Sequence, residues 1–337
     1  MTIQNVLRTG AVMRLPGAAT LAALATTTGL LLAPQSAVAQ AYPTKPIRIV
    51  VGFPAGTTTD TGARVLGVHM NKVLGQPLIV EARPGAGGVI GANVVVKAEP
   101  DGYTYFFGSV SNLHPIFTKN NPIDAGKDFA PVSDSMYAPY VLFSSAKLPA
   151  TNLQELVAYA KTQPPEKFNM PVTIANQELL MQVVKSKAGI TYTSIPYTSS
   201  AQFIPLLASG EIAIHVNLFG NFQAPLQAGT VRAIFVTAPK RTAQYPNVQT
   251  AAEAGIQGVE AAGFGAGFWA PRGTPRTMID RVSAAAVAAV KQPETIEQFR
   301  KLGYDTVGNS PEEQLKSYEA SMQFWRYAAQ LGNFQPQ

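Results

Sequence analysis

The chain lacks cysteine, has few charged residues and, after residue 40, has no apolar run that reaches the roughly 18 residues needed to cross a bilayer. Without cysteine it can form neither disulfides nor thiolate metal sites. Its composition, 46% hydrophobic and 14% charged over 337 residues, predicts a folded protein with a sizeable core. The basic residues behind the formal net charge of +6 are scattered, so we expect no nucleic-acid binding.

The first 39 residues differ from the rest of the chain. Arg8 and Arg14 give a basic start without acidic residues, and an Ala/Leu-rich run follows from Ala18 to Ala33. The run leads to Ala37-Val38-Ala39, which has the small-x-small pattern of a cleavage site. This order predicts a secretory signal peptide cleaved near Ala39, and a periplasmic protein. An N-terminal membrane anchor is the alternative.

The rest of the chain alternates short β-rich runs with amphipathic stretches. Such a series predicts an α/β fold with mostly parallel strands. We expect strands at 47–53, 77–81, 103–108, 141–144, 171–175, 194–197, 211–217 and 231–237. We expect helices at 61–74, 88–98, 153–162, 178–187, 201–208 and 221–228.

The last quarter of the chain has helical periodicity. Apolar residues at spacings of three and four place one face of each predicted helix in the core. The two stripes are Ile279, Val282, Ala286 and Ala289, followed by Leu315, Tyr318, Met322, Trp325 and Ala329.

Sequence signatures of enzymes are absent. The three histidines are far apart, and neither a P-loop nor a nucleophile elbow occurs. The segment Arg83–Asn93 suggests dinucleotide binding, but Ile90 stands where the third glycine of that motif should fall. Asp60 and Asp134 are the main candidates among sparse loop carboxylates, which leaves little for acid–base catalysis. We therefore predict no catalytic residue, metal or cofactor, although an enzyme remains an alternative.

The stretch "AGTTTD" after the first strand is suited to binding an anion. A helix N-terminus exposes unpaired N–H groups with a partial positive charge, so it can hold a carboxylate without lysine or arginine. Gly56, Thr57, Thr58 and Thr59 lie at such a terminus, and we expect Asp60 to be its N-cap. The alternative is that Asp60 and one threonine serve only as cap and turn.

Polar donors follow three further strands in the same way. Because parallel strands end at one edge of a sheet, where ligands bind, these junctions are predicted to contribute to one site. The residues are Ser109, Ser111 and His114, then Thr173 and Asn176, then Thr198, Ser199 and Ser200.

Several segments together resemble the Bug-type solute-binding proteins of tripartite tricarboxylate transporters. The most specific is "RPGAGGVIGANVVVKAEPDGYT" (83–104), and "FPAG" (53–56), "IPY" (195–197) and "FWAPRGTP" (268–275) support it. The resemblance covers essentially all of the chain after the signal peptide.

The resemblance implies two α/β lobes of the type II periplasmic-binding-protein kind, joined by two crossing segments. Lobe one would comprise residues 40–138 and 237–337, and lobe two residues 139–236. It also implies a carboxylate ligand held between the lobes. Carried over to this sequence, the lobe-one contacts would be Phe53, Ala55, Gly56, Thr57, Thr58 and Asp60, and Asn217 would join Thr198–Ser200 in lobe two.

Departures from the family pattern fall mainly in lobe two. Thr57 stands where the family favours glycine, Thr198 and Ser199 replace a lysine-glycine pair, and Asn217 replaces an acid. Gly265 replaces a bulky aromatic residue. With Phe203, Phe219 and Phe222 in nearby segments, the ligand is hypothesised to be larger or less charged at one end, for example an aromatic carboxylate. An ordinary dicarboxylate is the alternative.

Taken together, the sequence predicts a monomeric periplasmic protein that captures an organic carboxylate and delivers it to the permease subunits of a tripartite tricarboxylate transporter. The alternative from another class is a sensor that presents the same ligand to a signalling partner.

Overall fold

The structure is a computed structural model that describes residues 42–334, apart from residues 118–120, 165 and 243. The predicted signal peptide, which ends at Ala39, lies outside the described residues. The described residues form one compact unit, and the predicted lobe boundaries stay a prediction. Among the helices that the structure describes, none is long and apolar enough to cross a membrane.

Three parallel strands open the fold and confirm the first three predicted strands. β1 (Ile47–Val51) lies between β2 (Leu78–Ala82) and β3 (Thr104–Gly108). Alternate residues of β1 point to opposite faces, so Ile49 packs against α2 (Thr58–Leu74) while Val50 packs against α3 (Val89–Val96). Burial on both faces explains why β1 is a continuous apolar run.

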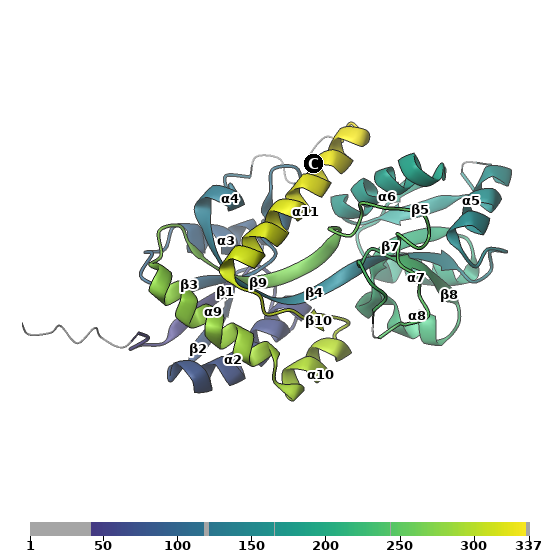
Figure 1. Ribbon diagram of the computed structural model, residues 1–337. Coiled ribbons are helices and arrows are strands. Elements are labelled where there is room, and N and C mark those ends of the chain that lie inside the picture. Colours follow the sequence, from purple (N-terminus) through teal and green to yellow (C-terminus); the bar gives the residue numbers. More distant parts are fainter. Residues whose placement is uncertain (1–41, 118–120, 165, 243, 335–337) are drawn as a thin grey trace, which may run out of the picture. The chain divides into compact units, whose positions relative to one another are not determined.

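Two long antiparallel strands connect the two parts of the sheet. β4 (Phe129–Ser145) pairs with β9 (Gly263–Pro271) along its first part and with β7 (Ile214–Leu218) and β8 (Val231–Val236) along its second part. We call β1, β2, β3, β9, β10 (Asp305–Thr306) and the first part of β4 the first half-sheet, and β7, β8 and the rest of β4 the second half-sheet. Figure 1 shows β4 continuing from the first half-sheet into the second, while β9 lies beside the first part of β4.

The sequence predicts only Val141–Ser144 of β4 and none of β9. Prolines at 131 and 139 and serines at 133 and 135 interrupt the apolar pattern of β4, and glycines do so in β9. The expectation of mostly parallel strands holds for β1, β2 and β3 and for the pair β5 (Asn169–Val172) and β6 (Thr193–Pro196). The connecting strands pair antiparallel, so the whole is a mixed sheet flanked by helices.

Helices flank the second half-sheet as the β/α alternation predicts. One apolar cluster joins β4 and β7 to helices on one face, and another joins β4 and β8 to helices on the other face. The first face carries α5 (Leu153–Thr162) and α6 (Ala175–Ala188). The second carries α7 (Ser200–Ser209) and the short segments η4 (Phe219–Phe222) and α8 (Gln223–Gln227). The remaining short segments are η2 (Ala86–Gly88), η3 (Ser111–Leu113) and α4 (Ala125–Asp128).

The C-terminal helices confirm most of the predicted apolar stripes. In α9 (Arg276–Val290) all four predicted core residues are buried. α10 (Pro293–Lys301) follows, and α11 (Pro311–Leu331) ends the described fold. In α11, Leu315 is 38% exposed, so its prediction as a core residue is wrong; the buried residue in that turn is the neighbouring Gln314.

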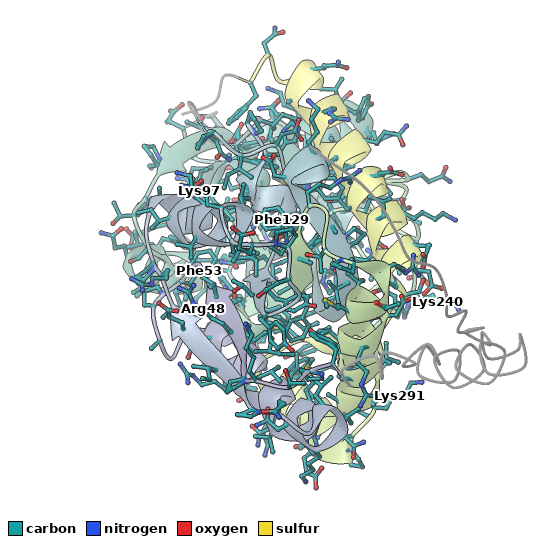
Figure 2. All side chains as sticks on the ribbon, turned by 90° about the vertical axis from the view of Figure 1, so that its left-hand side faces the viewer. Arg48, Phe53, Lys97, Phe129, Lys240 and Lys291 are labelled. Atoms are coloured by element: carbon teal, nitrogen blue, oxygen red, sulfur yellow. The ribbon has the colours of Figure 1, made fainter. Side chains whose placement is uncertain are left out.

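α11 packs against both parts of the fold. Tyr318 and Met322 lie in the apolar cluster of β3 and α3, whereas Trp325 and Ala328 lie in that of α5 and α6. The helix therefore extends along the connecting strands (Figure 1). In Figure 2, which looks onto the first half-sheet, Lys97 and Lys291 reach outward, while Phe129 is buried.

Candidate functional site

The N-terminus of α2 offers free backbone donors. The helix begins at Thr58, and its N-cap, Thr57, uses both its N–H (3.3 Å) and its hydroxyl (2.8 Å) to donate to the Pro54 carbonyl oxygen. The N–H groups of Thr58, Thr59 and Asp60 have no acceptor within the described part of the chain. Three open amides at the positive end of a 17-residue helix form a place where a carboxylate can bind.

Asp60 does not cap α2 in the predicted way. It lies in the third position of the helix, and its carboxylate turns back to accept the Gly56 N–H at 2.9 Å. Arg64 donates to both carboxylate oxygens at 2.9 Å, and this hydrogen bonding lowers the pKa of Asp60. Because the Asp60 side chain is only 2% exposed, it shapes the loop and leaves the three amides open.

Two glutamines repeat this arrangement at α6 and α7. Gln177 Oε1 accepts the backbone N–H (2.8 Å) and the hydroxyl (3.2 Å) of Thr173. Gln202 Oε1 accepts the same two groups of Thr198, at 3.1 and 3.0 Å. The predicted hydroxyl donors Thr173 and Thr198 are therefore engaged within their own loops. The sequence signal, Thr-x-x-x-Gln, is present at both places, although the sequence-based site omits the glutamines.

The first-turn amides of these two helices are open as well. Ala175 and Asn176 begin α6, and Ser200 and Ala201 begin α7, and none of their N–H groups has an acceptor among the described residues. The N-cap of α7, Ser199, lies in an extended conformation before them. Three helices thus share one design, in which a side chain in the first turn fixes the loop and the leading amides stay available.

The loop after β3 approaches the start of α6. Asn176 Nδ2 donates to Asn112 Oδ1 at 3.5 Å, which joins two of the four predicted junctions. Ser109 and Ser111 are half-buried, and their hydroxyls have no hydrogen-bond partner in the described structure. Both hydroxyls can therefore donate to a bound ligand.

His114 lies at the end of the same loop beside α11. Its Nδ1 accepts the Ile116 N–H at 3.1 Å, and Arg326 Nη2 lies 3.5 Å from its Nε2. Burial, followed by the charge of Arg326, lowers the pKa of His114, so the ring is neutral at pH 7. It would contribute a polar contact and no positive charge; its role as a ligand contact stays a prediction.

A buried polar chain supports the start of α7. Asn217 Nδ2 lies 3.4 Å from Ser200 Oγ and donates a hydrogen bond to His215 Nε2 at 3.1 Å. Because Nε2 accepts this bond, the proton of the neutral His215 ring is assigned to Nδ1. Nδ1 donates it to the Pro171 carbonyl oxygen at 3.0 Å. Burial lowers the pKa of His215 to about 3, which keeps the ring neutral. Asn217 also accepts from Asn221 Nδ2, so it holds Ser200 in place, and His215 is a supporting residue that the sequence prediction omits.

The phenylalanines at 203, 219 and 222, which the sequence places in segments near the predicted contacts, are buried in the core. All three are at most 3% exposed. Phe222 stacks on Phe143 with ring centroids 4.4 Å apart, and Phe203 lies 4.3 Å from the His215 ring. These rings build the core between the second half-sheet and α7, so they do not support an aromatic ligand.

The remaining predicted contacts surround the loop before α2. Ala55 and Gly56 are exposed, and Phe53 is half-buried beside the position that a Cβ of Gly88 would occupy. Gly56 has φ +82°, a left-handed conformation that glycine adopts without strain. None of the fifteen predicted contact residues is a lysine or arginine, so amides and hydroxyls would carry the recognition of an anion.

Comparisons with known proteins identify the family. The family model described as "Tripartite tricarboxylate transporter family receptor" matches residues 62–325. A curated UPF0065 protein of Bordetella bronchiseptica is 32% identical over 309 residues, covering 91% of each chain. The family model and this relative therefore both match most of the chain.

Solved structures of related proteins are similar to this chain over most of its length. The periplasmic binding protein BugD is 29% identical, with a TM-score of 0.68 over 86% of this chain and 99% of that one. A protein of R. palustris solved with adipate is 28% identical, with a TM-score of 0.73 over 88% and 100%. MatC of Rhodopseudomonas palustris, with bound malate, is 26% identical, with a TM-score of 0.66 over 85% and 99%.

The fold is that of periplasmic binding proteins, as the resemblance implies. Members of this family bind solutes and are not enzymes, which confirms the prediction that the chain has no catalytic role. The chain belongs to the tripartite tricarboxylate transporter receptor family, and it is a solute-binding protein.

Proposed function

We propose that the protein is exported to the periplasm and captures a small organic carboxylate with the leading amides of α2, α6 and α7. The observation that carries the proposal is the set of open first-turn N–H groups at these three helices, without a lysine or arginine side chain among the predicted contacts. A helix N-terminus favours an anion by charge and by hydrogen bonding at once. The neighbours solved with adipate and malate support a carboxylate ligand.

The predicted contacts, together with the open amide of Thr59, would bind different parts of the ligand. Thr58, Thr59 and the hydroxyls of Ser109 and Ser111 would bind one carboxylate from the first half-sheet. Ser200 and the first turns of α6 and α7 would close over the ligand from the second half-sheet, by the hinge motion expected of such proteins. Exposed Ala55 and Gly56 give access to the amides of α2.

A thermal-shift panel of mono-, di- and tricarboxylates, each beside its neutral amide, tests the proposal. At a hundred times its dissociation constant, a true ligand stabilises the fold by roughly 2.7 kcal/mol. We expect at least one acid to raise the melting temperature while its amide leaves it unchanged. The proposal fails if no acid raises the melting temperature, or if an acid and its amide act equally.

We propose further that the loaded protein delivers its ligand to the membrane subunits of a tripartite tricarboxylate transporter and that it acts as a monomer. The family description supports this partner. Uptake of the labelled ligand should require both this protein and those subunits. Uptake that continues after deletion of the membrane subunits would refute the delivery step and leave the binding proposal untouched.

A further inference from the structure

A hollow lies between α11 and the connecting strands β4 and β9. Its volume is about 420 Å³. Of the predicted carboxylate contacts, only Ser109 and Ser111 line it, and no residue from the starts of α2, α6 or α7 does. The hollow therefore meets the proposed carboxylate site only at these two serines, and the carboxylate proposal does not use the rest of it.

Small residues on both walls create the hollow. β9 presents Gly263 and Gly265, and α11 presents Ser317, Ala320 and Ser321 one turn apart. A Cβ at Gly265 would meet the Met136 carbonyl oxygen at 3.7 Å and Tyr137 Cδ2 at 3.8 Å, which are ordinary van der Waals contacts, so a side chain could begin here without a clash. Since Ser317 and Ala320 are exposed, a ligand could enter past α11.

The described part of the wall of the hollow has aromatic side chains, and its charged groups are acidic. Trp269 and Tyr318 meet edge to face with centroids 5.8 Å apart, and Tyr137 lies across from Gly265. Asp134 and Glu260 line the hollow, and the residues that the structure describes in its lining include no lysine, arginine or histidine. Aromatic faces attract cations, and so do carboxylates, so both components of the wall favour the same kind of ligand.

Asp134 has hydrogen-bond donors but no cation beside it. Its Oδ2 accepts from Asn309 Nδ2 at 3.0 Å, and its Oδ1 accepts from Gln314 Nε2 at 3.1 Å. It takes part in none of the ion pairs within the described residues. Burial raises its pKa because the charged form is poorly solvated there. A ligand with a positive charge would supply the missing counter-ion.

We propose that this hollow binds a small organic cation, with an ammonium group at Asp134 and an apolar or aromatic body between Trp269, Tyr318 and Gly265. An engineered cavity of about 150 Å³ is large enough for benzene. The hollow therefore has room for one ring with a short aminoalkyl chain. The cation site shares only Ser109 and Ser111 with the proposed carboxylate site, so the two ligands would bind side by side.

Titration with 2-phenylethylammonium, followed by calorimetry and tryptophan fluorescence, tests the proposal. The neutral control is 2-phenylethanol and the anionic control is 3-phenylpropanoate. We expect the ammonium compound to bind at least tenfold more tightly than the alcohol. The anion can occupy the proposed carboxylate site, so its test is competition, and we expect an excess of it not to displace the ammonium compound. Equal affinities for the ammonium compound and the alcohol, or no binding of the ammonium compound, would overturn the proposal.

Two variants and one matched control locate the binding. Asp134→Asn should weaken binding of the ammonium compound at least tenfold, whereas Asp101→Asn, at an exposed aspartate paired with Lys45, should leave it unchanged. Gly265→Leu should abolish binding by filling the hollow, which keeps the test decisive if Asp134→Asn does not fold. Unchanged affinity in Gly265→Leu would refute the proposed position.

A competition experiment separates this proposal from the carboxylate site. Protein saturated with a stabilising carboxylate should still bind 2-phenylethylammonium with unchanged affinity. The variant Thr58→Pro should also bind it normally, because Thr58 does not line the hollow. Mutually exclusive binding would show that the hollow belongs to the carboxylate site and would overturn the claim of a second site.

Discussion

Replacing Thr58 with proline removes one proposed ligand-binding group and little else. Thr58 is the first residue of α2, a position where proline is favoured because its φ already suits the helix and its missing N–H would be unpaired. The preceding residue, Thr57, has φ −68° and ψ 162°, the extended conformation that residues before proline prefer. The variant should therefore fold with nearly unchanged stability.

The expected loss of affinity follows from a single charge-assisted hydrogen bond. Such a bond contributes roughly 1.5–3 kcal/mol, so its removal should weaken carboxylate binding about ten- to hundredfold. Thr58→Val is the matched control, because it keeps the N–H and removes only the hydroxyl. Calorimetric titration of both variants with the same acid separates the backbone contribution from that of the side chain.

Unchanged affinity in a folded Thr58→Pro variant would refute the proposed role of the α2 amides. A large loss in Thr58→Val with no further loss in Thr58→Pro would instead assign recognition to the hydroxyl. Urea unfolding of both variants shows whether either result reflects the fold.

Three further predictions concern the residues that hold the loops. Asp60→Asn should lower the free energy of unfolding by about 1–2 kcal/mol, measured by urea unfolding, because it weakens the hydrogen bonds from Arg64 and from the Gly56 N–H. Arg64→Ala should lower it by less, because the Arg64 side chain is half exposed. Gln202→Met should weaken carboxylate binding with little change in melting temperature, since it frees the loop before α7; unaltered affinity would contradict this. Between pH 7.5 and pH 5, wild type should lose about 2 kcal/mol more stability than His215→Gln.

The sign of the pH effect follows from the pKa of His215, which is about 3 in the folded protein and 6.5 ordinarily. Below about pH 6.5 the unfolded chain binds a proton that the folded protein does not, so stability falls as the pH falls towards 3. Above pH 6.5 both forms are neutral and this histidine contributes no slope. An equal loss of stability in His215→Gln would exclude the buried ring as the source.

The sequence predicts the strand-to-helix junctions well, because apolar runs followed by polar turns depend on local patterns. The strands before Gly56, Ser109, Thr173 and Thr198 end close to where the sequence indicates, and open amides at three of these junctions fit the helix-terminus argument. The sequence does not show which groups a polar side chain will hydrogen-bond to. The sequence predicts Asp60 as the N-cap of α2, but its carboxylate accepts hydrogen bonds from Arg64, one turn later, and from the Gly56 N–H in the preceding loop.

Pairing partners far apart in the sequence explain the remaining differences. β9 becomes a strand because β3 and β4 supply hydrogen bonds on both sides, despite three glycines. Phe203 and Phe222 are drawn into the core by the second half-sheet, which no local pattern predicts. The sequence shows that Gly265 replaces a bulky aromatic residue of the family pattern, which leaves space beside β9. The hollow also requires the small residues of α11 on the opposite wall, which the sequence does not place there.

The crystal structure of the complex with the acid that stabilises the protein most tests the central claim directly. The account predicts carboxylate oxygens within about 2.7–3.2 Å of the backbone nitrogens of Thr58 and Thr59, the usual range for such hydrogen bonds. A carboxylate bound instead by a lysine or arginine side chain, away from the start of α2, would contradict it.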